Sequence, residues 1–169
     1  MKKVIFALLL LFPFMSSAQT FVLQKEDKTN ETILKGQCRY ADLLAQPDYT
    51  WMKDTARYLP DATAMQVLKK ELSNYNLVVL FGSWCSDSHL QLPHLYKVLQ
   101  EANMPMEKVQ LYGMDRAKKG RDVEDKIFKV DRVPTIILYK NNQEVGRIVE
   151  TPQRSLEADL VAMIEGDSR

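Results

Sequence analysis

Short apolar runs alternate with helix-like patterns in the second half of the chain. Leu77–Phe81 (LVVLF) is unbroken apolar sequence, which is typical of a strand buried on both faces. Ser86–Glu101 then places apolar residues at helical spacing, and Val109–Met114 predicts a second strand. Because a helix joins these two strands, we expect them to be parallel and connected by a right-handed crossover.

The remaining segments predict a helix, a hairpin and a last helix. Asp122–Val130 is expected to be a short helix with three side chains facing the core, namely Val123, Ile127 and Phe128. Thr135–Tyr139 (TIILY) and Glu144–Val149 are expected to pair as antiparallel strands across a turn at Asn141–Gln143. Thr151 is expected to cap the last helix, because a proline follows it in the first helical position. This order predicts an α/β fold with a central mixed β-sheet flanked by helices.

The N-terminal half has a weaker pattern. Apolar residues on both sides of the turn-prone segment 25–30 predict two short edge strands: Phe21, Leu23, Ile33 and Leu34. Residues 41–58 mix aromatic and apolar side chains around a proline, and we expect them to wrap the main domain. Asp61 fits the N-cap of a helix with a single apolar face: Met65, Leu68 and Leu72. We therefore expect 19–74 to be an N-terminal extension that packs on a main domain over 75–169.

The first 18 residues have the composition of a secretory signal peptide. Lys2 and Lys3 form a basic start, Val4–Phe12 is an apolar run, and small residues precede a cleavage site after Ala18. The run is short for a transmembrane helix, and an uncleaved anchor is the alternative. No later run is long enough to span a bilayer. We therefore expect an exported protein, periplasmic or secreted, with no transmembrane segment after cleavage.

The charge balance and the cysteine count narrow the function classes. The 169 residues include 23 Lys and Arg against 22 Asp and Glu, a balance that does not indicate a nucleic-acid partner. The mature chain is long enough for one domain with its own core. Cys38 and Cys85 are the only cysteines, too few for a disulfide framework. In an oxidising compartment, two cysteines are either a disulfide or free thiols with a function.

The stretch FGSWCSDSHLQLPHLY presents Cys85 where a buried strand ends and a helix begins. Unpaired N–H groups and the helix dipole favour a thiolate at such a position. Trp84 precedes the cysteine and is expected to shield one side of the sulfur. Ser88 lies three residues further on, on the same helical face, and is expected to donate its hydroxyl hydrogen to the thiolate.

These features together resemble the thioredoxin-like superfamily over Tyr75–Glu165. Trp84-Cys85 at the strand end, Pro93 in the helix, Val133-Pro134-Thr135 before a strand, and the final hairpin and helix agree with the family in their order. The W-C-x-D-S motif looks like that of some exported thioredoxin-like proteins with a single motif cysteine. The resemblance implies a thioredoxin-like fold and attack of the motif cysteine on protein disulfides.

The resemblance also implies a cis peptide bond before Pro134, which would expose the backbone of Val133 to an extended substrate. A trans proline that begins a strand is the alternative. Arg132 adjoins this element and is placed to contact a partner. A basic run earlier in the chain is expected to be a solvated loop: Arg116, Lys118, Lys119 and Arg121.

Two departures from the family pattern bear on activity. Ser88 is not a thiol, so it cannot resolve a mixed disulfide. Val79 stands where many thioredoxins have a buried acid. Asp87 either substitutes for that acid or is an ordinary first-turn acid favoured by the helix dipole. His89 is expected to be a partly exposed group that tunes the cysteine when protonated, and His94 to lie on the helix surface.

Cys38 leaves three possibilities open. It resolves a mixed disulfide at Cys85, forms a permanent disulfide with it, or is a small buried hydrophobe. Cys85 and His89 are four residues apart, which allows a copper site as a distant alternative, but we expect no metal and no cofactor. Two function hypotheses remain. One is an exported thiol–disulfide oxidoreductase or isomerase that acts on protein thiols and disulfides, and the other is a non-catalytic module that binds an extended peptide.

Overall fold

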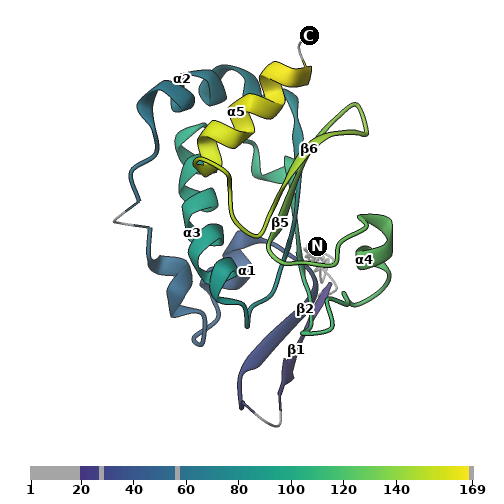
Figure 1. Ribbon diagram of the computed structural model, residues 1–169. Helices are drawn as coiled ribbons and strands as arrows, with labels where there is room; N and C mark the ends of the chain where they lie inside the picture. The colour runs from purple at the N-terminus through teal and green to yellow at the C-terminus, as the bar shows by residue number, and fades with distance from the viewer. Residues whose placement is uncertain (1–19, 27–28, 56–57, 168–169) are drawn as a thin grey trace, which may run out of the picture.

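The computed structural model describes residues 20–26, 29–55 and 58–167. Figure 1 shows a sheet seen nearly edge-on, with α1, α3 and α5 on one side of it and α4 on the other. The sheet has six strands in the order β1-β2-β4-β3-β5-β6. In chain order the strands are Phe21–Lys25, Thr32–Cys38, Asn76–Phe81, Val109–Gly113, Thr135–Lys140 and Gln143–Val149.

The helices are short except for α2, α3 and α5. The α-helices α1 to α5 are Tyr40–Leu44, Ala62–Glu71, Ser86–Glu101, Glu124–Ile127 and Leu156–Asp167. Three turns of 3-10 helix, η1 to η3, are Thr50–Lys53, Leu72–Asn74 and Met106–Lys108. None of the helices in the described ranges is long and apolar enough to cross a membrane.

The central strands follow the predicted pattern. β3 and β4 pair in parallel, and β3 also pairs with β5 in antiparallel register. Both faces of β3 are covered, because Val79 lies in the core under α3 and α5, while Val78 and Leu80 lie in a second cluster on the α4 side. Coverage on both faces explains the unbroken apolar sequence of this strand.

The helix over Ser86–Glu101 and the hairpin turn are confirmed. α3 has the predicted bounds and contains Pro93, which is buried. Asn141 and Asn142 both have positive φ, 51° and 63°, as the tight turn between β5 and β6 requires. Asp61 caps α2 as predicted, since its carboxylate accepts a hydrogen bond from the N–H of Ala64 at 2.8 Å.

Two helix predictions were wrong in part, although a short helix does lie within 122–130 and Phe128 packs inward against the second cluster. α4 covers only Glu124–Ile127, and it buries Glu124 and Asp125, whereas Val123 and Ile127 are 47% and 65% exposed. The carboxylate of Asp125 lies 2.6 Å from the ammonium of Lys119, and this pair lets the acidic side face inward. The start of the last helix was also misplaced, and its correction follows.

Ser155, and not Thr151, caps α5. The N–H of Ala158 donates to the Ser155 hydroxyl at 3.2 Å, and the helix begins at Leu156. Thr151 is exposed and lies in a bend before the helix. Both residues are good N-cap types, so local sequence did not distinguish them.

The segment 19–74 is more than an extension on the surface, because two of its strands complete the sheet. β1 is an edge strand, as predicted, but β2 lies inside the sheet between β1 and β4. The backbones approach closely at Gly113, where an added Cβ would lie 2.3 Å from the carbonyl oxygen of Leu34. Leu34 is fully buried in the main core, so β2 and the later strands share one hydrophobic interior.

The residues of this segment that follow β2 contact α3 and α5, as expected for a segment that wraps the main domain. Tyr58 stacks on His94 with ring centroids 4.0 Å apart, and its hydroxyl donates to Glu157 at 2.5 Å. His94 is therefore half-buried rather than a plain surface group, and burial lowers its pKa. The ammonium of Lys97 on α3 also donates a hydrogen bond to the carbonyl oxygen of Tyr58 at 2.5 Å.

Candidate functional site

Cys85 sits at the N-cap of α3, where β3 has ended. Its backbone is extended, with φ −97° and ψ 124°, and its side chain is partly exposed. A tight turn precedes it, because its N–H donates to the carbonyl oxygen of Gly82 at 3.0 Å. Cys85 therefore stands directly before the first turn of a sixteen-residue helix, where the N–H groups have no partner within the helix, and its side chain makes no capping hydrogen bond to them.

The loop before β5 faces this thiol. The Sγ of Cys85 lies 3.4 Å from the carbonyl oxygen of Val133, to which it donates its hydrogen. The peptide bond between Val133 and Pro134 is cis. Two hydrogen bonds hold the loop in place: the Thr135 hydroxyl donates to the carbonyl oxygen of Arg132, and the N–H of Glu150 to that of Pro134, both at 2.7 Å.

Arg132 extends from this loop into solvent. Its guanidinium forms an exposed ion pair with Glu150 at 3.1 Å. The pair leaves most of the Arg132 side chain accessible, at 62% exposure. A partner docked against Val133 would therefore meet this cation at the rim of the site.

Trp84 is held firmly beside the cysteine. Its indole N–H donates to the carbonyl oxygen of Met114 at 2.9 Å. Gly82 is needed for this position, because an added Cβ would lie 2.7 Å from the indole ring. The ring packs on the α4-side cluster, as Cys85 does, and shielding of the sulfur by Trp84 stays a prediction.

The basic run after β4 is more than a solvated loop. The guanidinium of Arg116 lies 5.1 Å from the centre of the Trp84 ring, and the ammonium of Lys118 lies 5.7 Å from it. Arg116 also pairs with Glu26 at 2.8 Å and with Glu31, so it joins the β1–β2 hairpin to the tryptophan. Local sequence could not predict that these cations lie over Trp84, because the residues that make the contacts are far apart in the chain.

Ser88 does not face the sulfur in the way predicted. Its side chain is fully buried, and its hydroxyl oxygen accepts a hydrogen bond from the N–H of Gly82 at 3.2 Å. The hydroxyl therefore stabilises the turn that presents Cys85. Burial in the first turn of α3 leaves Ser88 out of contact with solvent.

The position where many thioredoxins have a buried acid holds Val79 in this chain, and the nearby acid Asp87 is exposed. Val79 is fully buried in the main core, with no carboxylate in its place. Asp87 is exposed in the first turn of α3, which fits an acid placed by the helix dipole.

His89 has two partners that fix its ring. Its Nε2 lies 2.7 Å from the carbonyl oxygen of Ser83, which makes this nitrogen the donor. Its face stacks on Trp51, with ring centroids 4.4 Å apart and planes 19° from parallel. Trp51 comes from η1, so the N-terminal segment reaches the helix that carries Cys85. Sequence reasoning assigned Trp51 only a general packing role.

Cys38 lies apart from this site. It is in β2 opposite Leu111 of β4, and Leu111 in turn lies opposite Val79, six residues before Cys85 in the chain. Two strand spacings and several residues therefore separate the cysteines, and both are free thiols. Burial, and then the nearby carboxylate of Asp42, raise the pKa of the Cys38 thiol, so it stays protonated. The structure does not bring Cys38 to Cys85 as a resolving or disulfide partner.

The described residues hold no metal-binding cluster of three or more His, Cys, Asp or Glu side chains. His89 directs one nitrogen to a carbonyl oxygen, and Met104 and Met114 are buried in the core. The site is therefore a single cysteine flanked by a tryptophan, a cis-proline loop and a basic rim.

Comparisons with solved structures find several chains that are similar to this one. An HIV epitope scaffold is 15% identical and matches with a TM-score of 0.54, over 76% of this chain and 99% of its own. A protein of unknown function from Pseudomonas aeruginosa is 18% identical, with a TM-score of 0.45 over 76% of this chain and 75% of its own. Thioredoxin O2 from Arabidopsis thaliana, in its oxidised state, is 18% identical, with a TM-score of 0.39 over 61% of this chain and 82% of its own.

A comparison with curated proteins finds no match. The thioredoxin family model matches residues 59–165, a range that includes α2, which sequence reasoning had left in the extension. That range covers β3 to β6, Cys85 and the loop at Pro134. The chain therefore belongs to the thioredoxin family.

Proposed function

We propose that this protein is an exported thioredoxin-like thiol–disulfide oxidoreductase or isomerase that acts on protein disulfides through Cys85. The observation that carries the proposal is the contact between the partly exposed Cys85 thiol and the carbonyl oxygen of Val133, 3.4 Å away, at the start of a long helix. A substrate strand that pairs with the backbone of Val133 would bring its disulfide next to this sulfur. The signal-peptide composition of residues 1–18, which lie outside the described residues, supports export.

The chemistry is a pair of thiol–disulfide exchanges. The Cys85 thiolate attacks one sulfur of the substrate disulfide, forms a mixed disulfide, and releases the other substrate sulfur as a thiolate. A second thiolate then attacks the mixed disulfide and restores the Cys85 thiolate. When that thiolate is a different cysteine of the same substrate, it forms a new substrate disulfide with the trapped sulfur, and the substrate is isomerised with no net redox change. When it comes from an external thiol, that thiol keeps the substrate sulfur in a new disulfide.

Neither Ser88 nor Cys38 is suited to supply the second thiolate, the one that resolves the mixed disulfide at Cys85. Ser88 has no thiol, and Cys38 is buried, protonated and two strands away from β3. Resolution from outside the protein is thus the route that the arrangement supports. This route favours an isomerase, or an oxidoreductase that depends on an added thiol.

Trapping of mixed disulfides tests the proposal. The full-length chain is incubated with scrambled ribonuclease that carries non-native disulfides, quenched with acid, and analysed by non-reducing electrophoresis and mass spectrometry. We expect a covalent complex through Cys85 and recovery of ribonuclease activity. Cys85→Ala removes both, whereas Cys38→Ala retains both. Activity that survives Cys85→Ala, or is lost with Cys38→Ala in a folded protein, contradicts the proposal.

A second candidate function is a non-catalytic module that binds an extended peptide beside Val133. The cover of Arg116 and Lys118 over Trp84 and the absence of an acid at Val79 favour it. Partner capture on immobilised protein distinguishes the two functions. Partner binding that persists in Cys85→Ala and in the presence of reductant supports the peptide-binding module. Complexes that are lost in Cys85→Ala or on addition of reductant support thiol–disulfide exchange.

A further inference from the structure

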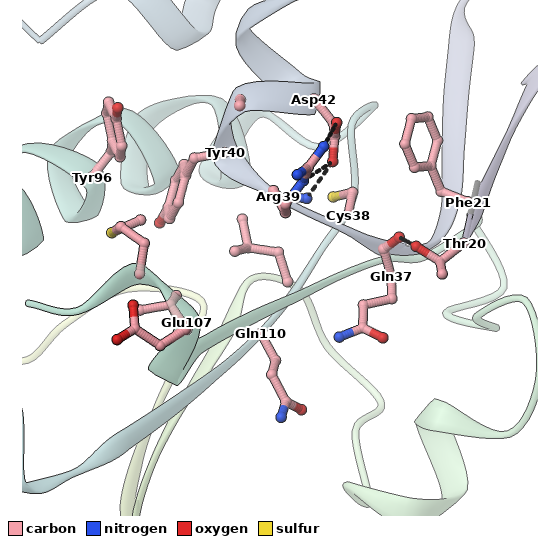
Figure 2. Close-up of a pocket in the computed structure, with 14 residues that line it drawn as sticks. Thr20, Phe21, Gln37, Cys38, Arg39, Tyr40, Asp42, Tyr96, Glu107 and Gln110 are labelled. Atoms are coloured by element: carbon pink, nitrogen blue, oxygen red, sulfur yellow. Dashed lines mark hydrogen bonds and ion pairs between the residues drawn. The ribbon is translucent and has the colours of Figure 1, made fainter. Parts of the chain in front are cut away.

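A pocket separate from the Cys85 site lies beside Cys38. Figure 2 shows a pocket bounded by β2, β4, α1 and the Tyr96 side of α3. Its volume is about 840 Å³, within the range of small-molecule sites. Neither Cys85 nor Trp84 lines it, so it is separate from the exchange site.

The Tyr40 hydroxyl in this pocket lacks a hydrogen-bond partner. Tyr40 is 3% exposed, and its oxygen is the one buried side-chain polar atom without a partner in the described residues. Buried hydroxyls are rarely left in this state, because loss of water without a replacement partner is costly. In Figure 2 the Tyr40 ring lies beside Tyr96, and its hydroxyl end points toward Glu107. The pocket therefore offers an unused polar group on an aromatic wall.

The state of this hydroxyl defines what it would bind. Burial, and then the nearby Cys38 and Tyr96, raise the pKa of Tyr40, so the phenol keeps its proton and acts as a donor. Its partner in a ligand must consequently be an acceptor oxygen. Cys38, on the same wall, is protonated as well and presents an uncharged surface.

The rest of the lining selects for shape and charge. Tyr40 and Tyr96 stack at 4.6 Å with planes 30° apart, and this wall suits a planar group. The charged lining residues are one cation and two carboxylates: Arg39, Asp42 and Glu107. Arg39 is already paired with Asp42 at 3.1 Å, so the balance disfavours an anion. Phe21, Val109 and Leu111 supply apolar surface.

We propose that this pocket binds a neutral, planar, mostly apolar small molecule whose carbonyl oxygen accepts a hydrogen bond from Tyr40. Such binding is independent of thiol–disulfide exchange, because no lining residue belongs to the Cys85 site. The ligand fills the space next to Cys38 and gives the buried phenol its partner.

Nile red, a neutral planar dye with a carbonyl oxygen, serves as the probe. Titration of the dye into the full-length chain is expected to give a saturable rise in fluorescence. Tyr40→Phe removes only the hydroxyl and is expected to weaken the affinity about fivefold, the worth of one net hydrogen bond. Tyr139→Phe, the same change on β5 and outside the pocket, leaves the affinity unchanged. The apolar run Val4–Phe12 contributes the same background to every variant.

Two further measurements separate the site from nonspecific dye binding. In the Cys85→Ser variant, methyl methanethiosulfonate labels Cys38, and saturating Nile red is expected to slow this labelling at least about fivefold, the difference expected at high occupancy. Thermal unfolding of Tyr40→Phe is expected to be unchanged or shifted upward, since an unpartnered hydroxyl is removed.

Four binding and labelling results would each overturn the proposal. They are an absence of saturable binding, equal affinity of Tyr40→Phe and the parent chain, no protection of Cys38, and tight binding of the anionic dye anilinonaphthalene sulfonate at the same site. A sharp loss of stability in Tyr40→Phe would likewise contradict it, because the hydroxyl would then have a partner already.

Discussion

Cys85 and Cys38 carry the same thiol in opposite surroundings. Cys85 is partly exposed at the N-cap of a long helix, and its Sγ faces a backbone carbonyl group. Cys38 is buried within a strand of the sheet, on the wall of an aromatic pocket, where burial keeps it protonated. Because the intrinsic chemistry of the two side chains is identical, we expect any difference in their reactivity to come from these surroundings.

The largest expected effect is on alkylation. Iodoacetamide at pH 7 should modify Cys85 at least about a hundredfold faster than Cys38, because labelling of a buried thiol waits for local opening of the structure. The rates are measured by mass spectrometry of the two cysteine peptides. In 6 M guanidinium chloride the two rates should converge. Comparable rates in the native state would break the contrast between the two thiols.

The second prediction restores a nearby thiol. Ser88→Cys places a thiol three residues after Cys85, in the first turn of the same helix, so the mixed disulfide with scrambled ribonuclease should decay at least about tenfold faster, through an intramolecular step. Quenched-flow electrophoresis measures this decay. Ser88→Ala is the matched control, and it should leave the decay rate unchanged. An unchanged lifetime in Ser88→Cys would show that lack of a local thiol does not limit release.

Ser88→Ala also tests the role of the buried hydroxyl. This change leaves the N–H of Gly82 without its partner and should lower the free energy of unfolding by about 1–2 kcal/mol. Urea unfolding followed by tryptophan fluorescence measures the difference. A neutral effect would mean that the turn before Cys85 does not depend on Ser88.

Trp51→Ala tests whether the N-terminal half supports the Cys85 helix. Loss of the stack on His89 should cost about 1–2 kcal/mol of stability, from the aromatic contact and the reduced burial. Cys85 alkylation should change less than about twofold, because the helix N-terminus itself remains. A large change in alkylation with little loss of stability would assign Trp51 to the reactive site.

The smallest expected effect concerns an ion pair that joins the loop beside Trp84 to β2, the strand that carries Cys38. Asp115 adjoins Met114 and forms an ion pair with Lys35 of β2 at 2.7 Å. Burial opposes ionisation, but hydrogen bonds from Lys35 and the N–H of Lys119 outweigh it and lower the pKa of Asp115. The stabilisation is therefore present above the unfolded pKa, near 3.8, and is lost as pH falls through the lower folded value.

Asp115→Asn should cost up to about 1 kcal/mol at pH 7 and less as the pH falls below 4. Urea unfolding at both pH values measures this. Equal losses at both values would show that charge is not what stabilises the link.

Much of the fold followed from local patterns. α3, the β5–β6 turn and the Asp61 cap each depend on residues close in the chain, and each was predicted. α4 was misread because an amphipathic pattern does not say which face turns inward when Lys119 is near enough to pair with Asp125. The buried position of β2 was missed because pairing with β4 is a long-range contact.

The site divides in the same way. Sequence by itself determined a cysteine at a strand–helix junction, a tryptophan before it, and a proline loop before a later strand, because each lies within one local motif. Only the tertiary structure decided that Ser88 turns to Gly82, that Arg116 covers Trp84, and that Cys38 lies beside a pocket instead of beside Cys85. These outcomes depend on contacts between distant segments, whose packing and hydrogen-bond partners are fixed when the whole sheet assembles.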